Sequence, residues 1–511
     1  MINGCFERRD KPMGNLAAIE KDFLNLLKEQ SGYKEILTLL HWDAHTNIPK
    51  NSVDNRAEVS GFLSGKLQQS ETSEKMKYYI DTLKDTTENE MIKKVIKECE
   101  TIYEKNRKIP QKEFEEYVMF CSKSESVWQE AREKSDFTLF QPYLERIVEY
   151  NKRFADYWGY ETNRYDALLH NHEPGITTKT LDTVFPELRK SLMDLIGRIN
   201  NSSVKSDSSI LVNPFPIKDQ EALSVDILQR LGYGSSSGRL DTSVHPYSFA
   251  INPNDVRVTT RYNDKDFRIA VFSAIHEAGH ALYEQNFAPK FHNTPLAEAA
   301  SMGIHESQSL FWEIFIGKSK SFWESNYELF KSYAPKHFHQ IPFDDFYLAL
   351  HEVKPSLIRV EADELTYPLH IMIRYELEKA LINGDIKVAE LPHLWNEKMV
   401  DYLGIKPPTD REGILQDIHW SSGDFGYFPS YTLGYMYAAQ LNHKLVKELD
   451  FNKRIKNNDY NAITEWFTKN VHQYGKTKKP LEMLEDVTKE KLNPNYLVQY
   501  LTEKYTEIYQ L

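Results

Sequence analysis

The sequence predicts a mainly α-helical protein with one short β-segment. Near the N-terminus, apolar residues recur every three or four positions, at Leu16, Ile19, Phe23, Leu26 and Leu27. This is the period of a helix with one buried face. The same spacing recurs, with lysine and glutamate filling the positions between as on a solvated face, at Ile92, Val95, Ile96, Cys99 and Tyr103. We therefore expect residues 1–190 to be almost wholly helical.

The β-segment is expected at residues 256–262. Two breaks rich in glycine and serine, at 200–209 and 232–241, come before it, and such segments form loops. The run VRVTTRY at 256–262 is β-branched and alternates in part, which favours a short strand or hairpin. An edge strand here would be able to pair with an extended peptide, whereas the alternative is an ordinary surface hairpin.

The composition indicates a folded, soluble protein. The 511 residues are 41% hydrophobic, 13% aromatic and 27% charged, which excludes a mainly disordered chain. The net charge is −12 and the basic residues are scattered, so nucleic acid is not expected as a partner. No segment approaches the run of about 18 apolar residues that spans a bilayer, so we expect no membrane partner.

Cysteine usage and the N-terminal residues predict a cytoplasmic protein. Cys5, Cys99 and Cys121 are widely spaced and make neither a disulfide framework nor a four-sulfur zinc site. The first residues carry charge where a secretory signal needs an apolar core. We expect residues 1–12 to be a disordered lead and residues 13–511 to form a single catalytic domain, because large helical enzymes often fold such a length into two lobes around one cleft.

The segment AVFSAIHEAGHALYEQ contains the pattern H-E-x-x-H. Aspartates before it predict a helix that begins near Asp264 or Asp266. One turn of this helix separates His276 from His280, so both imidazoles can reach one ion. Glu277 is rotated by about 100°, which suits a general base acting on metal-bound water. The alternative is a pair of core histidines beside a solvated glutamate.

A catalytic zinc ion also needs a third protein ligand and an open position. The carboxylate candidates downstream are Glu298, Glu306 and Glu313. In proteins with this motif that use a glutamate as the third ligand, the glutamate usually lies on a following helix, and Glu306, 26 residues after His280, fits that spacing best. A carboxylate in its apolar surroundings would also need a cation beside it. His305 is the alternative to Glu306.

These motifs resemble those of the carboxypeptidase Taq family of zinc metallocarboxypeptidases. Besides HEAGH, four further motifs of the family are present, and all five stand in the family's order. They are DVRVT at 255–259, before HEAGH, and HESQ at 305–308, IRVEAD at 358–363 and GILQDIHW at 413–420, after it. The resemblance extends to LLHNHEPG at 168–175 and GYFPSYTLG at 426–434. One departure is visible, because the family's H-P-F stands here as His245, Pro246 and Tyr247, which adds a hydroxyl to that subsite.

The resemblance implies a large two-lobed, zincin-like helical fold with a long central groove and a small β-hairpin or sheet beside the zinc helix. It implies a homodimer that removes the C-terminal residue from peptides with a free C-terminus, with broad specificity. His276, His280 and Glu306 would bind one Zn²⁺ per subunit, and Glu277 would be the catalytic base. The sequence leaves Co²⁺ or another divalent ion open in place of zinc.

A carboxypeptidase must bind a terminal carboxylate, and arginine does so through a bidentate fork. Arg359 and Arg257 are the candidates for this role. Arg359 falls in an expected helical run, where Glu361 and Asp363 are alternative partners for a structural salt bridge. For Arg257 the alternative is a pair with Asp255 that holds the fold.

The family motifs supply four further candidates. His245 of the H-P-Y segment is a candidate for substrate binding. His419, Tyr427 and Tyr431 lie in a run with turn-forming glycines that could curl over the site. An imidazole or hydroxyl there would stabilise the oxyanion that forms when the amide is attacked.

Two other classes of function remain open from the sequence. An oligoendopeptidase would use the same zinc helix in a groove that is open at both ends. A non-catalytic helical scaffold would hold zinc structurally, but H-E-x-x-H with only one further ligand leaves a coordination position for water, which argues against that class.

Overall fold

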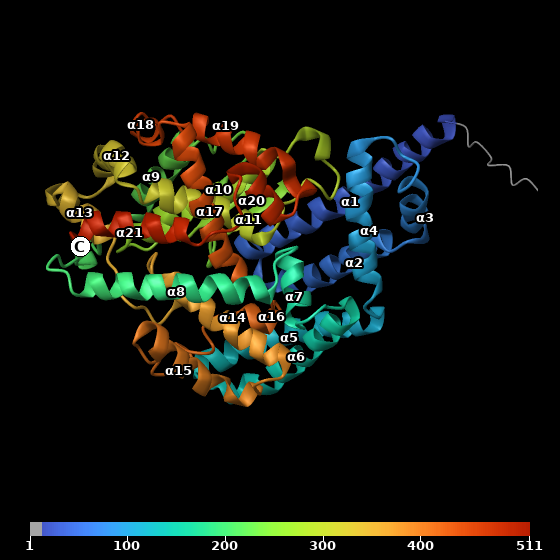
Figure 1. The fold of residues 1–511 in the computed structure, drawn as a ribbon, viewed down its shortest axis with the longest axis horizontal. Coiled ribbons are helices and arrows are strands. Elements are labelled where there is room, and N and C mark those ends of the chain that lie inside the picture. Colours follow the sequence, from blue (N-terminus) through green and yellow to red (C-terminus); the bar gives the residue numbers. More distant parts are fainter. Residues whose placement is uncertain (1–12) are drawn as a thin grey trace, which may run out of the picture. The chain divides into compact units, whose positions relative to one another are not determined.

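The computed structural model describes residues 13–511, and helices make up most of them (Figure 1). The predicted mainly α-helical fold is thereby confirmed. The lead expected at residues 1–12 lies outside the described residues, as does Cys5. Within residues 13–511, none of the helices combines the length and the apolar character needed to cross a bilayer.

The chain divides into two compact units. The first unit comprises the described residues up to Lys108 together with Ala288–Glu298, and the second comprises Ile109–Phe287 with Ala299–Leu511. The second unit contains both histidines of the H-E-x-x-H pattern and all the later motifs. The expectation of one catalytic domain with two lobes around a cleft stays a prediction.

The first unit is a group of helices around a small apolar core. Its elements are α1 (Met13–Thr46), α2 (Val53–Glu71), α3 (Glu74–Leu83) and α4 (Glu90–Arg107), with short 3-10 turns at Lys50–Ser52 and Pro289–Phe291. Helix α4 buries the same five positions that the periodicity predicts, which are Ile92, Val95, Ile96, Cys99 and Tyr103. Asn89 caps this helix through the backbone N–H groups of Met91 and Ile92.

The second unit begins with four helices, α5 (Gln111–Lys134), α6 (Phe137–Trp158), α7 (Tyr165–His172) and α8 (Thr178–Asn200), so the prediction of a helical N-terminal part is confirmed. A 3-10 turn (Ser208–Leu211) and α9 (Ile217–Arg230) follow. The two predicted loops are largely loops, although the first strand begins at Leu240, inside the second of them.

A three-stranded sheet, formed by β1 (Leu240–Thr242), β2 (Ser248–Asn252) and β3 (Asp255–Thr260), has the order β1-β3-β2. β3 pairs in parallel with β1 and antiparallel with β2. The strand expected near 256–262 therefore exists, but the idea that it is an edge strand is wrong, because its hydrogen-bonding groups are used on both sides. The hydroxyl of Thr260 donates to the carbonyl of Ala270 at 2.9 Å, which joins β3 to the next helix.

Helix α10 (Phe267–Gln285) follows the sheet and carries the H-E-x-x-H pattern. It begins after Asp266, the second of the two predicted starts, whose side chain accepts the backbone N–H of Arg268 at 3.1 Å. The helix is buried on most sides. It packs against α11 (Met302–Leu310), and α11 in turn packs against α17 (Pro429–Glu448) (Figure 1).

Further helices complete the second unit. A π-helical segment, η4 (Phe311–Gly317), continues directly from α11. The remaining α-helices are α12 (Lys320–Tyr333), α13 (Phe343–Leu350), α14 (Tyr367–Asn383), α15 (Leu391–Leu403), α16 (His419–Ser422), α18 (Phe451–Lys456), α19 (Asn461–Asn470), α20 (Pro480–Thr488) and α21 (Asn495–Tyr509). Short 3-10 turns connect several of them, at Lys336–Gln340, Arg359–Glu361, Val388–Glu390 and His472–Thr477.

Candidate metal centre and surrounding site

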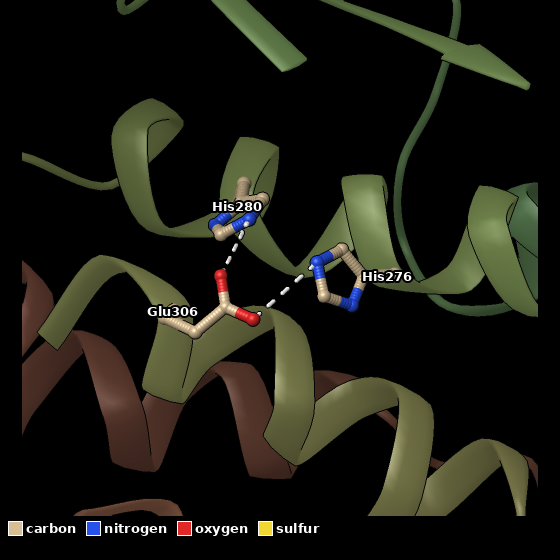
Figure 2. A group of neighbouring side chains, drawn as sticks. All are labelled: His276, His280 and Glu306. Atoms are coloured by element: carbon tan, nitrogen blue, oxygen red, sulfur yellow. Dashed lines mark ion pairs between the residues drawn. The ribbon is translucent and has the colours of Figure 1, made fainter. Parts of the chain in front are cut away.

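Three predicted ligand residues meet at one point of the second unit. Figure 2 shows His276 and His280 on one helix and the carboxylate of Glu306 turned toward both rings. Their ligand atoms all lie within 4.8 Å of one another, and within residues 13–511 no other cluster of this kind is found. His276 Nε2 lies 3.8 Å from Glu306 Oε1, and His280 Nε2 lies 3.7 Å from Oε2.

These distances suit a shared cation better than hydrogen bonds. A separation of 3.7–3.8 Å is too long for an N–H···O bond. A zinc ion binds imidazole nitrogen and carboxylate oxygen at about 2 Å, so an ion between the three groups would span the gaps. The donor set, two imidazoles and one carboxylate, therefore fits a divalent metal.

The far side of each ring is held by an oxygen acceptor. His276 Nδ1 lies 2.8 Å from Glu313 Oε2, and His280 Nδ1 lies 3.0 Å from the carbonyl oxygen of His305. A carbonyl oxygen and an ionised carboxylate only accept, so in both rings Nδ1 carries the proton and donates it. Once Nε2 carries no proton, each ring can offer the lone pair of Nε2 to a metal ion.

The centre carries an excess of negative charge that a cation would balance. Burial by itself lowers the pKa of His276, but the nearby carboxylates of Glu306, Glu313 and Glu277 outweigh burial and raise this pKa to about 10. Burial raises the pKa of Glu277 to about 7. A divalent ion would compete with a proton for Nε2 of His276.

The other ligand candidates take different positions. Glu298 pairs with Lys34 in the first unit, at 2.8 Å. The ring of His305 stacks on that of His280 with centroids 4.0 Å apart, and its Nε2 lies 3.3 Å from Glu284 Oε1. Glu306 is therefore the candidate that the structure brings to the two histidines.

Two glycines allow the three helices to approach closely enough to form the centre. A Cβ on Gly279 of α10 would lie 2.6 Å from the carbonyl oxygen of Gln308, and a Cβ on Gly434 of α17 would lie 2.7 Å from Glu306 Cβ. Contacts this short do not occur between real side chains and their neighbours, so larger residues would push the helices apart.

Glu173, a residue that sequence reasoning did not select, anchors the N-terminus of α11. Its side chain is fully buried and accepts the backbone N–H of Gly303, where the positive end of the helix dipole favours an acid. Burial raises the pKa of Glu173 to about 7. In the sequence, Glu173 is only an acid in a turn between helices, and this signal is not specific. Tertiary packing is what places its carboxylate at the N-terminus of α11.

Arg359 is buried, at 6% exposure, and bound to groups other than those expected. Its Nε and Nη2 lie 3.0 and 2.9 Å from Asp417 Oδ1, and Nη1 donates to the hydroxyl of Tyr367 at 3.0 Å. The expected helical run is wrong, and the alternative of a structural salt bridge with Glu361 or Asp363 is not what the structure has, because the partner is Asp417. Asp363 instead accepts the backbone N–H groups of residues 365 and 366, so Arg359 lies in a 3-10 turn and α14 begins only at Tyr367.

A second guanidinium shares the same carboxylate. Arg374, which is fully buried, donates through Nε to Asp417 Oδ2 at 2.6 Å. One acid between two arginines leaves a net positive charge at this place. Burial raises the pKa of Glu306, whereas His276, His305 and Arg359 act to lower it, so the arginine group is electrostatically coupled to the metal centre.

His419, Tyr427 and Tyr431 gather beside Arg359. His419 opens α16 and its Nε2 lies 3.1 Å from the hydroxyl of Tyr431, in the first turn of α17. The ring of Tyr427, in the connection between these helices, lies 5.2 Å from that of Tyr431. Burial and the charge of Arg359 lower the pKa of His419 to about 3, so its ring is neutral. Its Nδ1 is buried and finds no hydrogen-bond partner within the described chain.

Arg257 and His245 belong to the sheet region of the second unit. Arg257, on β3, forms a bidentate pair with Asp255, with Nε and Nη2 at 2.9 and 2.8 Å from the two carboxylate oxygens. This pair matches the alternative of a fold-holding role. His245 is exposed in the connection between β1 and β2.

Comparisons with known proteins match the chain to one family over most of its length. The family described as carboxypeptidase Taq (M32) metallopeptidase matches residues 22–505. Carboxypeptidase 1 of Bacillus subtilis is 51% identical over 495 residues, which cover 96% of this chain and 99% of the relative. Thermostable carboxypeptidase 1 of Thermus thermophilus is 36% identical, with 96% and 99% covered. The crystal structure of an M32 carboxypeptidase from Deinococcus radiodurans R1 superposes with a TM-score of 0.94 at 30% identity, with 97% and 100% covered.

The glycine contacts generate the first testable prediction. Gly434→Ala should weaken binding of a divalent metal ion, because the added Cβ would displace Glu306. Metal analysis after dialysis against a weak chelator would detect the loss. Gly197→Ala is the matched control, since Gly197 lies within helix α8 and a Cβ there meets nothing within 4 Å. If Gly434→Ala retained as much metal as Gly197→Ala, the close approach would have no bearing on the centre.

Proposed function

The chain belongs to the carboxypeptidase Taq (M32) family of metallopeptidases, and from this premise we propose that His276, His280 and Glu306 hold one zinc ion in its peptidase site. The predicted function is confirmed: the protein is a metallocarboxypeptidase, an enzyme that removes residues from the C-terminus of peptides. The observation that supports the ligand set is the convergence of two Nε2 atoms on one carboxylate, with both Nδ1 atoms occupied.

Zinc is the metal we propose. Two histidines and one glutamate make up a common ligand set of catalytic zinc, and Co²⁺ accepts the same donors. When bound, the ion would lower the pKa of a water molecule and polarise the carbonyl of the scissile bond. The remaining steps fall to side chains of the protein.

Glu277 is the proposed general base. It lies next to His276 on α10 and is 7% exposed. Because burial raises its pKa to about 7, its carboxylate can take up and release a proton near neutral pH. We assign it both transfers: it accepts the proton of the attacking water at a carboxylate oxygen and delivers it to the leaving amine.

Arg359 is the proposed anchor for the terminal carboxylate of the substrate. Three of its five N–H bonds point to Asp417 and Tyr367, so two remain for a bidentate contact. Arg359 and Arg374 carry two positive charges against the single negative charge of Asp417, and the remaining positive charge would favour an anionic ligand. A free C-terminus supplies that charge, whereas an amidated C-terminus does not.

His419 and Tyr431 are proposed to stabilise the oxyanion, with Tyr427 beside them. The neutral His419 ring has a buried Nδ1 that finds no partner among residues 13–511, and a buried polar atom of this kind is a candidate for a substrate contact. For Arg257 and His245, a role in substrate binding stays a prediction that rests on the family motifs.

We further propose broad specificity, a homodimer and a cytoplasmic location. The resemblance to the family supports the first two. Cys99 and Cys121 are buried free thiols, which fits a reducing compartment. The family match favours the exopeptidase over the oligoendopeptidase and over the scaffold with structural zinc.

A digest of matched peptides tests the proposed function. We expect stepwise loss of single C-terminal residues from a peptide with a free C-terminus, because Arg359 needs the terminal carboxylate, and no cleavage of the same peptide with an amidated C-terminus. A chelator should stop the reaction, and zinc should restore it. Mass spectra that show internal cleavage of both peptides would contradict the exopeptidase assignment.

The role of Glu277 can be separated from metal binding. Glu277→Gln preserves size but removes the proton acceptor, so turnover should fall by about 10²–10⁴-fold while zinc remains bound. Steady-state kinetics combined with metal analysis of the same sample measures both. A variant that is fully loaded and fully active would rule out Glu277 as the base.

The third ligand can be tested against an acid of the same segment. Glu306→Ala removes the carboxylate between the two histidines, so its zinc content after dialysis should fall sharply. Glu298→Ala serves as the control, because Glu298 pairs with Lys34 and should leave the metal content unchanged. Equal metal content in the two variants would exclude Glu306 as a ligand.

A further inference from the structure

Glu313 is a largely shielded acid to which the proposed peptidase mechanism assigns no role. Its Oε2 lies 2.8 Å from His276 Nδ1, and its Oε1 lies 2.7 Å from Lys318 Nζ. Both side chains of this ion pair are largely shielded, with 17% of Glu313 and 19% of Lys318 exposed. The carboxylate therefore bridges a proposed ligand histidine and a lysine.

The backbone around Glu313 brings the acid and the lysine together. Glu313 lies in the π-helical segment η4, two turns after Glu306, so both acids face α10. The N–H of Lys318 donates to the carbonyl of Glu313 itself, at 2.8 Å, which closes a wide turn between the two residues. Such π-turns are rare and occur often at functional sites.

Lys318 is held at both ends. Its ammonium lies 5.1 Å from the ring centroid of Phe272, which is one turn before His276 on α10. Its carbonyl oxygen lies 2.9 Å from His351 Nε2. With the lysine fixed in this way, the Glu313 carboxylate has one defined orientation toward the ring of His276.

The two ligand histidines are supported differently. His280 donates to a neutral backbone carbonyl, that of His305, at 3.0 Å. His276 donates to a charged carboxylate, which forms the stronger bond and makes the ring a better donor to a cation. The support of His276 is also the one that a side-chain substitution can remove.

We propose that Glu313, oriented by Lys318, is a positioning residue of the metal centre, which fixes the ring plane and the Nδ1–H tautomer of His276 and thereby strengthens binding of the divalent ion. This inference rests on the proposed ligand role of His276. Glu313 does not touch the substrate in this account. It acts through the histidine.

Metal affinity of the full-length protein tests the proposal. Each variant is stripped with a chelator and titrated with Zn²⁺ against a chromophoric chelator. Glu313→Ala should bind zinc about 10–100-fold more weakly. Glu313→Gln keeps an oxygen that can accept from Nδ1 but loses the charge, so its loss should be smaller. Lys318→Met should also weaken binding, because it frees the carboxylate from its orientation.

A matched control separates this effect from the loss of any ion-paired acid. Glu376 pairs with Lys398 and also accepts from a tyrosine hydroxyl, that of Tyr402, on the outer side of α14. Glu376→Gln should leave the zinc affinity unchanged. The absorption spectrum of the Co²⁺-loaded protein gives a second readout, since it should change in Glu313→Ala and match the parent protein in Glu376→Gln.

Folding is monitored by thermal melting of the metal-free proteins. If Glu313→Ala is unfolded, Glu313→Gln and Lys318→Met carry the test. Zinc affinities within twofold of the parent protein in the folded variants would overturn the proposal. His276→Ala distinguishes a failure of the positioning role from a failure of the proposed ligand set. If His276→Ala loses zinc while the Glu313 variants do not, only the positioning role fails. If His276→Ala retains zinc, the proposed ligand set fails as well.

Discussion

The close approach of α10, α11 and α17 is the constraint on which the site depends. Glu306 reaches the two histidines only because α11 lies against both neighbours, and a Cβ at Gly279 or Gly434 would collide with the backbone or with Glu306 itself. A densely packed interior does not absorb such collisions without moving the helices. The buried acid Glu173 adds a contact at the N-terminus of α11. Helix α11, which carries Glu306, is therefore fixed by its packing against α10 and α17 and by this contact at its end.

Charge is distributed in two opposite groups beside this packing. The metal centre gathers the acids Glu277, Glu306 and Glu313 around the two histidines, and a divalent cation would compensate them. The neighbouring group sets Arg359 and Arg374 against the single acid Asp417, which leaves positive charge for an anion. The charge of Arg359 acts to lower the pKa of Glu306, so the two groups lie near enough to interact.

The sequence predicts those parts of the fold and site that have a local signal. The five buried positions of α4 follow from their period, α10 begins at a capping aspartate, and His276, His280 and Glu306 follow from spacing. Pairing between separate segments decided much of the rest. β3 is a central strand because β1 pairs with its other edge, and Arg359 is bound by Asp417, which lies 58 residues later in the chain. Arg374, Glu173 and the support given by Glu313 emerge only when separate helices pack together.

The most direct test is a crystal structure of the zinc-loaded protein with anomalous data collected on both sides of the zinc edge. We expect one strong anomalous peak at about 2 Å from His276 Nε2, His280 Nε2 and a carboxylate oxygen of Glu306, with one position left for solvent. A peak bound by other side chains, or a centre in which Glu306 points away from the ion, would contradict it.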